Sequence, residues 1–312
     1  MLLRSVRPGV HAASLVFVLG LVAGAAVSGS QEPDAQNSLY RPQRVISFEH
    51  VRQELVLKCD VGMLVIRPIA DNIAHVRYFP TLKRAASPAA AIGAAPPLPK
   101  YRAESTPGAI RLVLSQLTVS VDRRTAQLTF LDAKQNILLA SRLCQLSRRP
   151  GAEGPDFNIH AEFLAPTDEA YYALGQYEDE SLNQRGRTVS QWQDFQDPDG
   201  RPATMPFLVT NRKYGFAFDN ASKTTVTPGK AGLTTWDAEA GDALSYYVIY
   251  GNTADDIYRG YRSLAGRPPL PSGPADIGGI GPCASGAGPE GAVHAELHAG
   301  APDGNCHMRQ DS

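Results

Sequence analysis

Short apolar runs separated by turn-forming residues constrain the fold of this chain more than any other feature. Residues 117–121 show the pattern clearly, because Leu117, Val119 and Val121 alternate with polar neighbours. A period of two places apolar side chains on one face of a β-strand. Similar runs cover residues 45–51, 55–59, 61–66, 73–79, 110–114, 126–131, 159–165, 224–227, 233–238 and 243–250. Many short strands at this spacing predict an all-β protein, an antiparallel β-sandwich or a barrel.

The run at 243–250 is apolar on both of its faces. Tyr246, Val248 and Tyr250 share one face, and Tyr247 and Ile249 share the other. A strand with two apolar faces is buried between two layers of structure. We therefore expect this strand to lie in the interior.

The strongest helix signal covers residues 253–264. Thr253 suits the N-cap position, and two aspartates follow it in the first turn, where negative charge is favourable. Gly266 is a stop signal, and Pro268–Pro269 forbid continuation of the helix. The sequence thus predicts one helix after the strands.

Residues 171–220 combine apolar-aromatic runs with strongly polar loops. Carboxylates, amides, a guanidinium and Trp192 are concentrated in these loops. Such groups suit a sugar, since polar groups bind its hydroxyls and an indole covers its apolar C–H face. A polar sheet edge with solvated loops is the alternative interpretation.

The order of short motifs in this stretch resembles a known family. The motifs are Y-Y-A-L-G-Q at 171–176, L-N-Q-R-G at 182–186, W-Q at 192–193 and P-F-L-V-T-N-R-K-Y-G-F-A-F-D-N at 206–220. They are similar to the N-terminal β-domain of glycoside hydrolase family 31, which contains α-glucosidases, α-xylosidases and related transglycosylases. Ala173 stands where the family usually has glycine. The resemblance implies a galactose mutarotase-like supersandwich.

The resemblance also implies a role for the loop at 193–204, which in the family often reaches the substrate pocket. Asp197 is the first candidate for binding a sugar hydroxyl, followed by Asp194, Asp199 and Trp192. The family's nucleophile lies in a W-x-D-x-N-E type of motif within a catalytic barrel, and this sequence contains no such motif. We therefore assign no catalytic residue, no cofactor and no metal ligand.

The charge balance restricts the partners. The chain has 312 residues with Lys+Arg 30 against Asp+Glu 31, a formal net charge of −1. Nucleic-acid binding needs a basic patch, which this composition does not favour. The expected partners are a carbohydrate, an α-glucoside or an α-xyloside, and a missing or separately encoded catalytic barrel.

Residues 1–30 have the pattern of a secretory signal peptide. Arg4 and Arg7 precede an apolar segment at 14–27, and small residues follow it. An uncleaved membrane anchor is the alternative. The signal predicts a secreted or periplasmic protein, without membrane attachment after cleavage.

The expected domains are a β-sandwich at 31–252, a connecting helix and junction at 253–271, and a disordered tail at 272–312. The tail is rich in Gly, Ala and Pro, so it cannot bury enough apolar surface to offset the entropy of folding. We interpret it as an out-of-frame translation, with a natural low-complexity tail as the alternative. Cys283, His294, His298 and Cys306 in this tail lack the spacing of a zinc site.

Cys59 and Cys144 lie in the expected sandwich, and the sequence leaves open whether they form a disulfide or remain buried thiols. We expect a non-catalytic domain of an α-glycosidase that is inactive by itself. A stand-alone carbohydrate-binding module and a scaffold that docks a separately encoded barrel are the alternatives.

Overall fold

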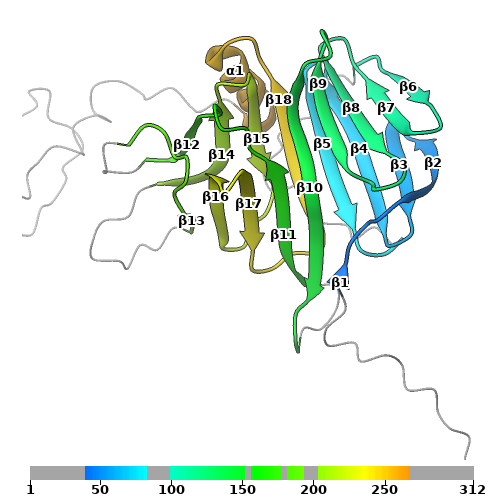
Figure 1. Ribbon diagram of the computed structural model, residues 1–312, viewed down its shortest axis with the longest axis horizontal. Coiled ribbons are helices and arrows are strands. Elements are labelled where there is room, and N and C mark those ends of the chain that lie inside the picture. The colour runs from blue at the N-terminus through cyan, green and yellow to red at the C-terminus, as the bar shows by residue number, and fades with distance from the viewer. Residues whose placement is uncertain (1–38, 83–98, 152–155, 177–180, 193–202, 267–312) are drawn as a thin grey trace, which may run out of the picture. The chain divides into compact units, whose positions relative to one another are not determined.

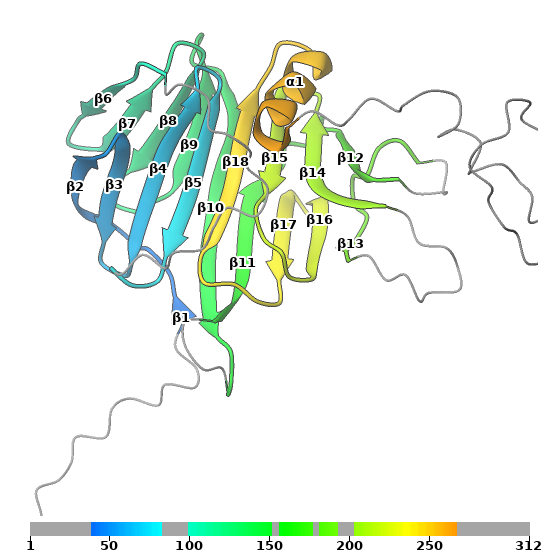
Figure 2. The same cartoon turned by 180° about the vertical axis from the view of Figure 1, so that it is seen from behind.

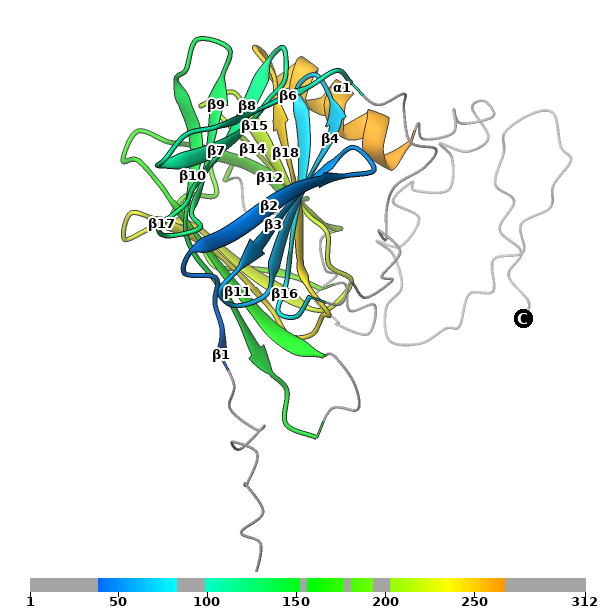
Figure 3. The ribbon, with the colours of Figure 1, turned by 90° about the vertical axis from the view of Figure 1, so that its right-hand side faces the viewer.

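The computed structural model describes residues 39–82, 99–151, 156–176, 181–192 and 203–266. The chain divides into two units, Met1–Ala265 and Gly266–Ser312, and all elements below belong to the first. Two antiparallel sheets pack face to face in that unit (Figure 1, Figure 3). The expected all-β sandwich is therefore confirmed.

The ten-stranded sheet faces the viewer in Figure 1. β1 (Leu39–Tyr40) pairs with β10 outside the main path. The other strands follow in the order β13 (Val189–Gln191), β16 (Thr224–Lys230), β17 (Leu233–Ala238), β11 (Phe157–Leu164), β10 (Ile137–Arg148), β9 (Leu128–Asp132), β8 (Leu117–Asp122), β7 (Ala109–Val113) and β6 (Arg102–Ser105).

The eight-stranded sheet lies behind it and comes to the front in Figure 2. Its order is β12 (Tyr171–Gly175), β14 (Thr204–Thr210), β15 (Tyr214–Phe218), β18 (Leu244–Tyr250), β5 (Ile73–Phe79), β4 (Met63–Ala70), β3 (Glu54–Cys59) and β2 (Val45–Val51).

An aromatic cluster occupies the space between the sheets. The ring of Phe216 stacks on Trp236 at 5.1 Å and on Tyr246 at 4.9 Å, and meets the edge of Phe163 at 4.9 Å. All four side chains are almost fully buried. Since these rings come from both sheets, the cluster holds the sandwich together.

The strand β18 is buried on both faces, as its sequence predicts. Tyr246, Val248 and Tyr250 belong to the core between the sheets. Tyr247 and Ile249 belong to a second cluster on the outer face of the eight-stranded sheet, which includes helix residues. The helix thus forms a third layer over part of that face (Figure 2).

The helix α1 (Ala254–Ala265) begins and ends where its sequence signals lie. Thr253 is the N-cap, since its hydroxyl accepts the N–H of Asp256 at 3.2 Å while its own N–H donates to that carboxylate. Gly266 has φ +91°, the left-handed conformation that ends helices. Tyr261 stacks on Phe207 of the sheet at 4.2 Å.

The longest strand, β10, has no counterpart among the sequence predictions, and neither do the short strands β1, β6 and β13. The register of β10 shifts between Ile137 and Leu139, where it pairs with β9, and again between Ser141 and Leu143, where it pairs with β11. Each irregularity changes which face the following residues occupy, so the alternation of apolar residues is lost. Cys144 on this strand and Cys59 on β3 are free thiols.

Two predicted segments lie outside the described residues, namely the signal peptide at 1–30 and the tail at 272–312. Within the described residues, no helix has the length and apolar character needed to cross a membrane.

Candidate functional site

The L-N-Q-R-G motif binds the beginning of β12 and fixes its position. The side-chain oxygen of Asn183 accepts the N–H groups of Tyr171 at 3.0 Å and Arg185 at 3.1 Å. The N–H of Gln184 donates to the carbonyl of Tyr171 at 2.8 Å. Two of the motifs that carry the family resemblance are therefore joined by hydrogen bonds.

A buried polar network continues from Arg185. Its guanidinium donates to the backbone carbonyl of Glu169 at 2.7 Å and lies 5.8 Å from the ring centre of Tyr171. The carboxyl of Glu169 is 1% exposed and accepts the hydroxyl of Tyr214 at 2.6 Å. Burial raises the pKa of Glu169. These contacts link β12, β15 and the R-G segment, which indicates a structural role.

Strand β12 ends in three consecutive residues with positive φ, Ala173 at +73°, Leu174 at +70° and Gly175 at +124°. Residues other than glycine adopt this backbone conformation at a cost in free energy. The conformation of Ala173 explains why glycine is usual at this position in the family. A backbone under strain is thus held next to the loop that the resemblance singles out.

The ends of that loop are anchored beside the strained turn. The side chain of Gln191 donates to the carbonyl of Leu174 at 2.9 Å, and the N–H of Gln176 donates to the carbonyl of Ala203 at 2.9 Å. Trp192 follows Gln191 and is 48% exposed. Three further predicted site residues lie outside the described residues: Asp194, Asp197 and Asp199.

The outer surface of the ten-stranded sheet carries a row of polar side chains, which we call the polar face. Strand register aligns Ser190, Thr225, Asp237, His160 and Gln145 across β13, β16, β17, β11 and β10. The alternation of β13 assigns Trp192 to the same side as Ser190, because the residue between them is buried. The polar face therefore reaches the predicted site.

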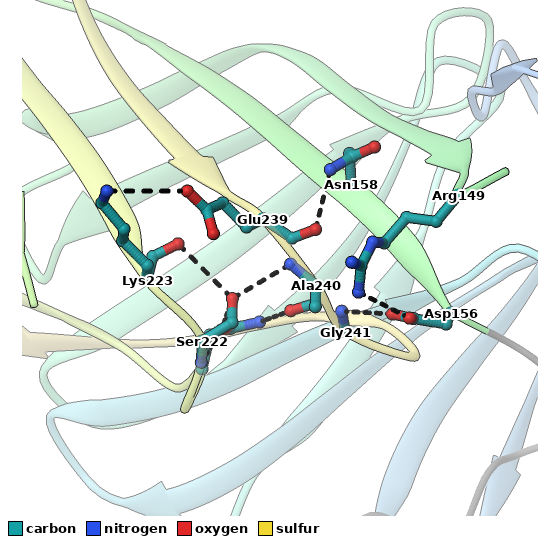
Figure 4. Close-up of polar contacts among 9 residues, drawn as sticks. Arg149, Asp156, Asn158, Ser222, Lys223, Glu239, Ala240 and Gly241 are labelled. Atoms are coloured by element: carbon teal, nitrogen blue, oxygen red, sulfur yellow. Dashed lines mark hydrogen bonds and ion pairs between the residues drawn. The ribbon is translucent and has the colours of Figure 1, made fainter. Parts of the chain in front are cut away.

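A second set of contacts borders the polar face near the turn after β17 (Figure 4). Lys223 and Glu239 form an ion pair at 3.9 Å, and Asn158 donates to the backbone carbonyl of Glu239 at 2.7 Å. The carboxylate of Asp156 accepts the N–H of Gly241 at 3.2 Å and a guanidinium hydrogen bond from Arg149 at 2.8 Å. These contacts fix the border of the face.

Local sequence patterns do not reveal the polar face. The residues that form it are distant in sequence, and each alternates with buried neighbours as on any half-exposed strand. The pairing of His160 with Asp237 marks the polar face, but this pairing depends on the register of β11 and β17, which the sequence does not show.

His160 lies between two carboxylates on this face. Its Nδ1 is 2.6 Å from Asp237 and its Nε2 is 3.1 Å from Glu162, which also binds Arg142. The hydrogen bond to Asp237, followed by the one to Glu162, raises the pKa of His160 from 6.5 to about 9. The positive charges of the imidazolium and of Arg142 balance the negative charges of Asp237 and Glu162.

The raised pKa predicts a stability change with pH. His160 contributes stability that is fully present below pH 6.5 and is lost as the pH rises through about 9. We expect His160→Gln to cost about 1–2 kcal/mol at pH 6, allowing for partial solvent exposure, and much less at pH 10. Urea denaturation at the two pH values measures this. His50→Gln, a change to an exposed histidine that stacks on Tyr101, is the control. An equal loss at both pH values would contradict the prediction.

Among the described residues, no group of three or more His, Cys, Asp or Glu side chains is arranged so that it could hold a metal ion. Cys283, His294, His298 and Cys306 of the tail lie outside the described residues.

The fold and these motifs define a galactose mutarotase-like sandwich. The sequence matches the family model of the glycosyl hydrolase 31 N-terminal galactose mutarotase-like domain over residues 63–226. This chain belongs to glycoside hydrolase family 31.

Two curated relatives are similar over most of this chain. An α-xylosidase of Saccharolobus solfataricus is 31% identical over 214 residues, which cover 65% of this chain and 28% of the relative. Alpha-glucosidase 2 of Bacillus thermoamyloliquefaciens is 26% identical over 238 residues, 72% of this chain and 29% of the relative. The chain therefore spans less than a third of these relatives.

Solved structures of the same family share the fold. The dextranase of Flavobacterium johnsoniae has a TM-score of 0.63 at 19% identity, covering 74% of this chain and 29% of that protein. An α-xylosidase from a soil metagenome has a TM-score of 0.63 at 23% identity, covering 70% and 34%.

Proposed function

We propose that this chain is the non-catalytic N-terminal β-sandwich of an α-glycosidase that hydrolyses O-glycosidic bonds of α-xylosides or α-glucosides. The match to the N-terminal domain model supports the position in the enzyme, and the names of the two relatives support the substrates. The partner in this proposal is a catalytic barrel. The signal pattern of residues 1–30 supports secretion or export to the periplasm.

We further propose that the sandwich binds carbohydrate at the loop that follows β13. The observation that carries this proposal is the half-exposed indole of Trp192, which stands next to the polar face at the beginning of the loop with Asp194, Asp197 and Asp199. An indole packs on the C–H face of a sugar, and the hydroxyls and carboxylates beside it bind sugar hydroxyls.

The binding proposal is tested by titrating the full chain with maltotriose and with isoprimeverose, an α-glucoside and an α-xyloside. Trp192 is one of two tryptophans, and Trp236 is fully buried, so a change in fluorescence on binding reports on Trp192. We expect Trp192→Ala to weaken binding at least about fivefold, since an aromatic contact contributes roughly 1 kcal/mol. Isothermal titration calorimetry measures binding by this variant, because the substitution removes the fluorescent reporter. Asp197→Ala should also weaken binding.

Tyr258→Ala is the matched control. Tyr258 is 40% exposed but lies on α1, against the other sheet. Its replacement should leave binding unchanged. Binding that survives Trp192→Ala, or no saturable binding of either sugar, would refute the carbohydrate site. We expect no release of nitrophenol from aryl α-glucosides or α-xylosides by this chain, and turnover would refute the non-catalytic assignment.

A further inference from the structure

A cavity of about 330 Å³ enters the sandwich through the ten-stranded sheet. It lies between the β8–β9 turn, β10 and the segment that joins β1 to β2, and it reaches the inner face of the eight-stranded sheet. Its lining includes Arg41, Gln127, Ser141, Cys144, Phe163 and Tyr246. The cavity is separate from the Trp192 region, which does not line it.

The cavity exists because β10 leaves its neighbour β9 halfway along its length. The β9–β10 pairing ends at Ala140, and the pairing of β10 with β1 begins only at Leu146. Between these points, two side-chain bonds bridge the gap: Ser141 accepts the N–H of Leu128 at 2.7 Å, and Gln127 donates to the carbonyl of Arg142 at 3.0 Å. The opening is therefore held by specific contacts.

The inner end of the cavity is lined by Tyr246. This residue is 1% exposed, its ring is fixed by Phe163 at 5.5 Å and Phe216 at 4.9 Å, and its hydroxyl is a hydrogen-bond donor. The walls beside it include the apolar side chains of Leu64, Val76 and Phe163, while polar groups line the outer part.

The mouth of the cavity is positively charged. Arg41 lines it and has no ion-pair partner among the described residues, whereas the nearby Arg142 is paired with Glu162. The guanidinium of Arg41 is thus available to an anion. From mouth to inner end, the cavity offers a cation, an apolar space and a hydrogen-bond donor.

We infer that this cavity binds a small aromatic carboxylate with an oxygen substituent opposite the carboxyl group. The carboxylate lies at Arg41, the ring fills the apolar space, and the substituent oxygen accepts the hydroxyl of Tyr246. The volume is sufficient, because an apolar cavity of about 150 Å³ already holds benzene.

The test uses the full chain and 4-methoxybenzoate as the probe, followed by NMR titration of backbone amides. We expect saturable shifts at Gln127, Ser141 and Cys144 with a dissociation constant on the order of a millimolar, as suits a ligand of this size. Benzoate lacks the inner acceptor and 4-methylanisole lacks the carboxylate, so each should bind more weakly.

Two variants separate the contacts. Tyr246→Phe keeps the ring and should weaken the binding of 4-methoxybenzoate about three- to tenfold, while the affinity for benzoate stays unchanged. Arg41→Ala should remove the advantage of the carboxylate and leave 4-methylanisole unchanged. Arg44→Ala, in the same segment but away from the cavity, is the matched control.

The inference is overturned if no probe shifts these amides, or if neither variant changes the relative affinities of the three probes. Arg41 is exposed, so its variant keeps the test decisive even if Tyr246→Phe unfolds the protein. Shifts confined to the Trp192 region would also overturn it, and failure of the sugar titration would leave it untouched.

Discussion

Replacing Phe216 with alanine is expected to lower the free energy of unfolding by about 3–5 kcal/mol, the largest effect of any change considered for this protein. Phe216 is 2% exposed and its ring contacts Phe163, Trp236 and Tyr246. Alanine would leave a cavity among rigid rings from both sheets, which cannot close without moving a strand. Since domains are stable by only about 5–15 kcal/mol, the variant would lose a large part of its stability.

Urea denaturation, followed by the near-ultraviolet signal of Trp236, measures the effect. Tyr258→Ala removes a ring of similar size from the surface of α1 and should cost less than about 1 kcal/mol. Phe216→Leu should fall between the two. If Phe216→Ala and Tyr258→Ala destabilise the protein equally, the aromatic cluster does not hold the sheets together.

Replacing Gly175 with alanine is expected to cost about 2–3 kcal/mol, for two reasons. Its φ of +124° is a conformation that other residues avoid, and an added Cβ would lie 2.3 Å from the carbonyl oxygen of Ala203. Because Ala203 precedes β14 and bonds to Gln176, the clash would also displace the end of the predicted sugar-binding loop. Thermal denaturation and the sugar titration measure the two consequences.

Two further variants separate strain from clash. Gly232 has φ +78° and no atom near its missing Cβ, so Gly232→Ala should cost only about 1 kcal/mol. Ala173→Gly relieves a positive φ and should stabilise the protein by about 0.5–1 kcal/mol, after the greater freedom of the unfolded chain is allowed for. A Gly175→Ala loss no larger than that of Gly232→Ala would show that the contact with Ala203 is unimportant.

Local patterns in the sequence were sufficient to predict most of the described strands and the helix α1. Strands β2, β5 and β17 have the predicted boundaries, because their turns and alternation are regular. The two-sided burial of β18 is also confirmed. Strand β10 could not be predicted in this way, since its irregularities break the alternation and arise from pairing with three different strands.

The site was less predictable than the fold. The sequence motifs single out one loop as the candidate site, and Trp192 at its beginning is exposed. Yet Asn183 and Arg185, which contribute to the family resemblance, bind the backbone of neighbouring segments. Such contacts hold the strained turn in place. The polar face and the cavity depend on strand register, which no local sequence pattern encodes.

The position of β18 has a consequence for biosynthesis. This strand is the last one along the described part of the chain, yet it pairs with β5 on one side and β15 on the other. The side chain of Asn72 even binds the carbonyl of Tyr250, a residue 178 positions later. During synthesis, β5 and β15 therefore lack their partner β18 until Tyr250 has emerged from the ribosome. Such distant pairing makes refolding slow, on the order of milliseconds to seconds, with apolar surface exposed in the interval.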